Sequence, residues 1–101
     1  MSDELWFHPL VQRDMNETLG YYQDHAGRAV AEHFELEVRE ALAAITRNPR
    51  SHPFYLQQRR YRRCKLSTFP HLILFSESNG ALKIMVLKHV KRAPGYGLGR
   101  R

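Results

Sequence analysis

The chain has 101 residues, and its hydrophobic content of 43% and aromatic content of 11% are typical of a folded protein and exclude a disordered tail. This length suits one modest core, so we expect a single domain over residues 1–101. The only cysteine, Cys64, excludes an internal disulfide. The N-terminal residues do not resemble a signal peptide and no apolar run is long enough to cross a membrane, so we expect a cytoplasmic protein.

The net charge of +6 is divided unevenly between the two halves of the chain. Residues 1–46 carry three basic and nine acidic side chains, whereas residues 47–101 carry thirteen basic side chains and one acidic residue, Glu77. A single basic run is explained by a solvated strand face, but segregation over the whole chain predicts a basic surface for a polyanionic partner.

The acidic half has the periodicity of helices. Pro9 ends a short apolar segment and suits the first turn of a helix. Apolar residues then recur at three- and four-residue steps, with a break at Gly27, and a second apolar stripe ends before Asn48-Pro49. We expect a strand over Glu4–His8, a helix from Leu10 to about Tyr22 and a helix over Val30–Ile45.

The basic half has the pattern of strands. The Asn79-Gly80 step favours a two-residue hairpin, because both central residues of such a turn need positive φ. The segment after it is apolar on both faces, so we expect it in the middle of the sheet. The predicted strands are Gln57–Leu66, Leu72–Ser76 and Leu82–His89, followed by a basic tail from about residue 91.

The order of these elements is β-α-α-β-β-β, which predicts an α+β fold with two helices on one face of a mostly antiparallel sheet. Five local motifs run along nearly the whole chain: Phe7-His8-Pro9, Tyr21-Tyr22, Asn48-Pro49, Arg62-Arg63 leading to Phe69-Pro70-His71, and the segment His89–Tyr96. With this order and spacing, the chain resembles the RelE/ParE superfamily of toxins from bacterial type II toxin–antitoxin systems.

The resemblance implies a toxin that is neutralised by a small acidic antitoxin in a hetero-oligomer. We expect a metal-independent, ribosome-associated messenger-RNA endoribonuclease that needs no cofactor. Two alternatives stay open, since members of the superfamily also include non-enzymatic inhibitors of DNA gyrase, and a catalytically inactive nucleic-acid-binding relative fits the same charge pattern. Whether the protein is an enzyme is therefore undecided by the sequence.

Cleavage of RNA by its own 2′-hydroxyl needs a base, an acid and cations for the phosphorane. The histidines show no metal-ligand spacing with Cys64, so the cations must come from the basic half. Six of the seven residues from Arg59 to Lys65 are basic or aromatic. On an extended strand, alternate residues share one face. We expect this face to bind phosphate and RNA, with Arg63 and Lys65 as the leading contacts beside Arg59 and Tyr61.

Three residues at the end of the last predicted strand complete the proposed site. Histidine is the usual proton carrier in catalysis near neutral pH, so His89, with Arg63 and Tyr96, forms the predicted catalytic set. Arg92 is placed to clamp a phosphate, and Tyr96 to stack on a base or donate its hydroxyl proton. The alternatives are a structural His89 and a Tyr96 that anchors the tail on the sheet. Glu77 is the only acid in the strands, which makes a carboxylate base doubtful.

Overall fold

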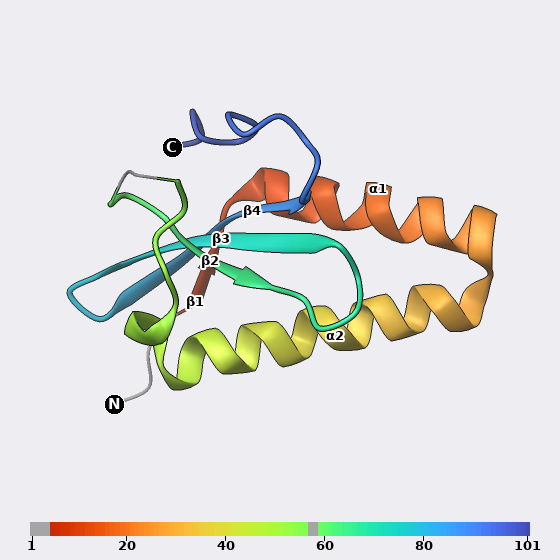
Figure 1. The fold of residues 1–101 in the computed structure, drawn as a ribbon, viewed down its shortest axis with the longest axis horizontal. Helices are drawn as coiled ribbons and strands as arrows, with labels where there is room; N and C mark the ends of the chain where they lie inside the picture. Colours follow the sequence, from red (N-terminus) through yellow and green to blue (C-terminus); the bar gives the residue numbers. More distant parts are fainter. Residues whose placement is uncertain (1–4, 57–58) are drawn as a thin grey trace.

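The computed structural model describes residues 5–56 and 59–101 (Figure 1). Glu4 and Gln57, with which two of the predicted strands begin, lie outside the described residues. The elements are β1 Leu5–Phe7, α1 Pro9–Ala26, α2 Arg28–Arg47, a short 3₁₀ helix Pro49–Ser51, β2 Arg62–Lys65, β3 His71–Ser78 and β4 Ala81–His89.

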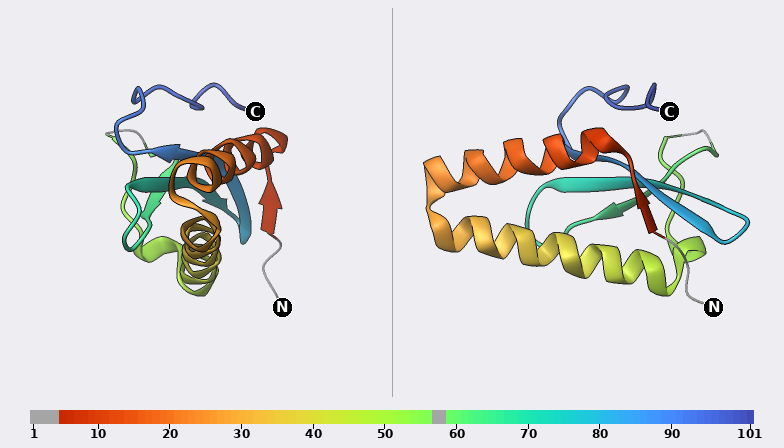
Figure 2. Two further views of the ribbon diagram at one scale, coloured as in Figure 1. Left: turned by 90° about the vertical axis from the view of Figure 1, so that its right-hand side faces the viewer. Right: turned by 180° about the vertical axis from the view of Figure 1, so that it is seen from behind.

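Both predicted helices are confirmed, although α1 continues four residues beyond Tyr22 to Ala26, and α2 begins at Arg28, two residues before Val30. The imidazole of His8 caps α1 by accepting a hydrogen bond from the amide of Leu10 at 3.1 Å, and Pro9 occupies the first turn. Gly27 separates α1 from α2, and α2 ends at Asn48. The helices therefore form an antiparallel pair that runs along one side of the sheet (Figure 2).

The strands form one mixed sheet in the order β1-β4-β3-β2. β1 pairs in parallel with β4, while β4 with β3 and β3 with β2 are antiparallel. The predicted hairpin is confirmed, because Asn79 and Gly80 have φ of 54° and 81°. The predicted α+β fold and the interior position of β4 are therefore confirmed.

The basic strand is shorter than predicted. Only Arg62–Lys65 belongs to β2, whereas the backbone carbonyl of Tyr61 accepts a hydrogen bond from the amide of Tyr55 at 2.8 Å. Phe54 forms an isolated bridge with Arg62. The preceding loop thus pairs with the residues that we expected to lengthen the strand, so the prediction of strand at Arg59–Tyr61 is wrong.

Apolar side chains fill both faces of the sheet. A β-bulge opposite Leu74 and Phe75 places Met85 and Val86 on the same face. We call the two clusters the helix-side core and the tail-side core. The helix-side core contains Val11, Phe34, Val38, Ala41, Ile45, Cys64, Leu66, Ile73, Phe75, Leu82, Ile84 and Leu87. The tail-side core contains Tyr55, Tyr61, Leu72, Leu74, Met85 and Val86.

A buried carboxylate on α2 fixes the connection between β2 and β3. Glu37 is 4% exposed and accepts hydrogen bonds from the amides of Thr68 at 2.9 Å and Phe69 at 3.3 Å, and from the Thr68 hydroxyl. Burial alone raises the pKa of Glu37, but these hydrogen bonds outweigh burial and lower it. The carboxylate therefore stays ionised and holds the loop against the helix.

Candidate functional site

The C-terminal segment after β4 folds back across the sheet on the side away from α2 (Figure 1). Tyr96 and Leu98 pack against the tail-side core. Gly97 lies so close to β4 that a Cβ atom there would meet the side chain of Val86 at 2.5 Å. We call residues 90–101 the tail. It covers part of the sheet face that carries the predicted phosphate contacts.

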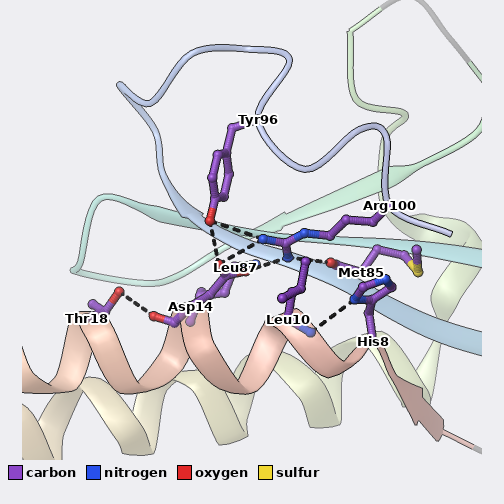
Figure 3. Close-up of polar contacts among 8 residues, drawn as sticks. All are labelled: His8, Leu10, Asp14, Thr18, Met85, Leu87, Tyr96 and Arg100. Carbon is purple, nitrogen blue, oxygen red and sulfur yellow. Dashed lines mark hydrogen bonds and ion pairs between the residues drawn. The ribbon is translucent and has the colours of Figure 1, made fainter.

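A buried ion pair holds the end of the tail. Arg100 donates two hydrogen bonds to Asp14 on α1, from Nη1 to Oδ2 at 2.7 Å and from Nη2 to Oδ1 at 3.0 Å (Figure 3). The side chains of Arg100 and Asp14 are 6% and 3% exposed. The Tyr96 hydroxyl donates to Asp14 Oδ1 at 2.7 Å. These three residues form one polar network, which we call the tail anchor.

The tail anchor also satisfies the backbone of β4 beyond the end of β1. The amide of Leu87 donates to Asp14 Oδ2 at 3.1 Å, and Arg100 Nη1 donates to the carbonyl of Met85 at 2.8 Å. β1 reaches only Ile84 in the β4 register. Side chains thus replace the missing strand, since buried backbone groups need partners.

The contacts within the tail anchor raise the pKa values of Arg100 and Tyr96. Hydrogen bonding to Asp14 raises the pKa of Arg100 despite its burial, and burial with the same carboxylate raises the pKa of Tyr96. Both side chains act as donors to the Asp14 carboxylate. This geometry agrees with the alternative in which Tyr96 anchors the tail, and its catalytic role stays a prediction.

A buried lysine provides a second attachment for the tail. Lys88 is 3% exposed, and its ammonium group donates to the Tyr55 hydroxyl at 2.9 Å and to the carbonyl of Ala93 at 2.8 Å. The Tyr55 hydroxyl donates in turn to the carbonyl of Pro94 at 3.2 Å. Lys88 thus joins β4, the loop before β2 and the tail.

The predicted phosphate contacts lie on the tail side of the sheet. Arg63 and Lys65 are exposed on β2, opposite Leu74 and Leu72 of the tail-side core. Tyr61 shares their side but is only 1% exposed, so its ring is not available for stacking on a base. Arg63 and Lys65 therefore share an exposed face as expected, but Tyr61, the aromatic residue expected to be exposed on that face, is buried.

The remaining predicted residues lie apart from Arg63. His89 is the register partner of His71, and the two rings are 5.2 Å apart. His71 packs against Phe34 of α2, so this pair lies on the helix side of the sheet. Arg92 stacks on Tyr96 at 4.0 Å, and Arg59 lies 5.3 Å from the Phe54 ring. The structure therefore joins Arg92 with Tyr96 but separates His89 from Arg63.

Sequence reasoning missed Asp14, Lys88 and Arg100. Asp14 follows Val11 by three residues and so falls within the apolar stripe of α1, which is a signal that an acid is buried there. Lys88 follows an apolar stretch of β4, which likewise signals a buried charged side chain. Arg100 carries no local signal, since its partner is 86 residues away.

A groove of about 490 Å³ lies on the other side of the molecule, between α1, α2 and β1. Its walls are mainly apolar, with Phe7 and Met15 among them, and Glu35 and Arg39, one turn apart on α2, form an ion pair at 3.8 Å along one wall. None of the helices described is both long and apolar enough to span a bilayer.

Comparison with known proteins gives two matches of different kinds. The fold resembles a solved structure described as the chromosomal ParDE toxin–antitoxin system from P. aeruginosa, with a TM-score of 0.75 and 13% identity over 85% of this chain and 94% of the other. No individual curated protein matches the sequence significantly. The family model for the ParE toxin of the type II toxin–antitoxin system parDE matches residues 5–94, so the chain belongs to the ParE toxin family.

Proposed function

We propose that this ParE-family toxin acts by binding DNA gyrase and not by cutting RNA. The observation that carries the proposal is the separation of the groups that RNA cleavage would need. His89 lies on the helix side of the sheet, Arg63 lies on the tail side, and the Tyr96 hydroxyl is engaged by Asp14. General acid–base catalysis requires such groups within hydrogen-bond reach of one substrate, whereas binding requires only a surface.

The exposed cations give this surface its charge. Arg63 and Lys65 on β2 and Arg92 in the tail are all exposed. A gyrase complex carries DNA, and a basic surface both speeds encounter with such a complex and contributes salt-dependent affinity. This role requires that these cations contribute more to inhibition than other exposed cations of the chain do.

Expression of the chain in cells, followed by assays of plasmid supercoiling and message integrity from one culture, tests the proposal. We expect loss of supercoiling with intact messages. The double variant Arg63→Ala, Lys65→Ala should relieve the inhibition of purified gyrase at least tenfold, by removing two phosphate contacts. The matched control, Arg28→Ala with Arg39→Ala, removes two exposed cations from α2 and should retain inhibition.

A ribosome-associated, metal-independent messenger-RNA endoribonuclease is the second candidate. It is supported by the exposure of His89 together with that of Arg63 and Lys65. Cleaved messages in the wild-type culture that become intact in the variant Arg63→Ala, His89→Ala would establish it and overturn gyrase binding. Salt-sensitive binding of nucleic acid with no growth arrest would instead identify an inactive relative.

A small acidic antitoxin is the expected partner. Tyr96 and Leu98 of the tail already pack against the tail-side core of the sheet. The exposed basic residues of β2 remain open to an acidic chain. Attraction between opposite charges weakens as the salt concentration rises, so binding to this surface should depend on salt. Copurification with the product of a neighbouring gene at low salt, and its dissociation at high salt, would test this partner.

A further inference from the structure

A row of three residues crosses the sheet on the tail side. Trp6 on β1 is in register with Lys83 on β4, and Lys83 is in register with Ser76 on β3. The next residues along β4 and β3, Ile84 and Phe75, belong to the helix-side core. Because successive side chains of a strand point to opposite faces, the row faces away from the helices.

The tail and the loop before β2 turn this row into a pocket of about 230 Å³. Arg60 is held over it by hydrogen bonds to the carbonyls of Leu98 at 3.2 Å and Arg100 at 3.1 Å. The lining residues are Trp6, Arg60, Tyr61, Ser76, Lys83, Met85, Arg100 and Arg101. The sheet, the loop before β2 and the tail therefore each contribute polar groups to the pocket.

The pocket carries uncompensated positive charge. Arg100 is neutralised by Asp14, whereas the contacts of Arg60 among the described residues are neutral: two carbonyls and the Tyr61 ring at 4.9 Å. Among the residues that the structure describes, Lys83 and Arg101 have no carboxylate within ion-pair distance, and no acidic side chain lines the pocket. Clustered Arg and Lys groups with a hydroxyl nearby favour a phosphate.

An exposed aromatic ring adjoins these cations. Trp6 is 44% exposed, and the Lys83 ammonium lies 5.8 Å from the centre of its ring. Proteins that bind single strands combine basic grooves with aromatic rings on which bases stack. The pocket is smaller than the roughly 300 Å³ at which small-molecule sites begin, which suits an enclosed phosphate and a base at the rim.

We infer that this pocket binds one nucleotide unit, with its phosphate held by Lys83, Arg60 and Arg101 and its base stacked on Trp6. The nucleotide belongs to a single-stranded nucleic acid or is free in solution, since both present the same chemistry. The site is distinct from Arg63 and Lys65. It does not depend on which target the toxin attacks.

Fluorescence anisotropy of a labelled oligothymidylate of about six nucleotides, titrated with the purified chain at low salt, tests the inference. Lys83→Gln and Trp6→Ala should each weaken binding about tenfold, as expected for one lost phosphate contact or one lost stacked base. Lys91→Gln is the matched control, because it removes the same charge from an exposed lysine outside the pocket. It should weaken binding less than about twofold.

If Lys83→Gln and Lys91→Gln weaken oligonucleotide binding equally, the pocket is not the binding site and the affinity comes from the general positive charge of the surface. Trp6→Phe keeps an aromatic ring and should retain most of the affinity, while thermal unfolding shows that each variant is folded. Binding by Trp6→Ala as tight as that of the wild type would overturn stacking.

Competition identifies the ligand. Thymidine monophosphate should displace the oligonucleotide at lower concentration than inorganic phosphate does. Equal displacement by the two would overturn the nucleotide assignment. Competition by the mononucleotide as strong as that by an unlabelled oligonucleotide would identify the free nucleotide as the ligand, and stronger competition by the oligonucleotide would identify a single strand.

Discussion

The two faces of the sheet are covered in different ways. The helix-side core packs two long helices against the sheet through apolar side chains such as Phe34 and Ile45, both fully buried. The tail-side core is smaller and is covered by a segment without helix or strand, attached through Asp14, Lys88 and Arg100. The helices are held on the sheet mainly by burial of apolar side chains, whereas the tail depends to a large extent on a few polar contacts.

This difference predicts different modes of opening. Removing the helices from the sheet exposes the larger core and amounts to unfolding the protein. Releasing the tail breaks a small number of contacts and leaves the rest of the fold in place, as in local unfolding. Four variants test this distinction, beginning with the largest expected effect.

Phe34→Ala should destabilise the whole protein. It removes a fully buried ring from the helix-side core, which typically costs about 3–5 kcal/mol. Urea unfolding measures the loss, and Leu36→Ala, at a helix position that is 50% exposed, is the control. A loss below about 1 kcal/mol for Phe34→Ala would contradict the assigned core.

Arg100→Ala should cost about 3 kcal/mol, because it leaves Asp14 buried without its cation. Arg101→Ala is the matched control, since the neighbouring arginine is exposed. Hydrogen exchange should show faster exchange in the tail and an unchanged pattern in α2. The comparison of the two faces fails if both helices lose protection together with the tail.

Lowering the pH should reduce the free energy of unfolding through protonation of His71, which packs on the helix side of the sheet. Burial, with the nearby His89 and Lys65, lowers the pKa of His71 from 6.5 to about 4. Between these values the unfolded chain binds a proton that the folded chain does not, so stability falls as the pH is lowered. Unfolding at about pH 7 and pH 5 should differ by about 2 kcal/mol from this residue.

His71→Phe should remove most of that difference while keeping a ring among Tyr22 and Phe34. His25→Gln, on the exposed surface of α1, is the control and should behave as the wild type. An unchanged pH dependence in His71→Phe would show that another group is responsible.

Gly97→Ala should have the smallest effect on global unfolding, about 1 kcal/mol. Its φ of 81° disfavours any side chain, and the new Cβ would meet Val86. The tail can move away from the sheet and so relieve both the backbone strain and the contact with Val86, which limits the loss in free energy of unfolding. Faster hydrogen exchange in the tail, with unchanged exchange at Gly99→Ala, whose position is open, would confirm the close contact.

The sequence was sufficient for features that depend on neighbouring residues. Pro9, Gly27 and Asn48 set the helix bounds, and the Asn79-Gly80 turn set the hairpin, because each acts on its own backbone. The order of the elements followed from the same local patterns. These features need no knowledge of distant contacts.

The candidate site was less predictable because it depends on contacts across the chain. The alternation of Arg63 and Lys65 was correct, but Tyr61 is buried beneath the tail, which no local pattern indicates. The side on which His89 lies follows from its register with His71. A bulge at Met85 changes that register and cannot be counted from the sequence.

The side chains beside β4 have a consequence for association between chains. β4 has nine residues, but β1 pairs with it only as far as Ile84. An unpaired stretch of strand is a template on which another chain can add. Asp14 and Arg100 occupy the backbone groups of Leu87 and Met85 that such a chain would use. A chain that lost Arg100 would leave the Met85 carbonyl of its longest strand without this partner, and we expect it to self-associate more readily than the wild type.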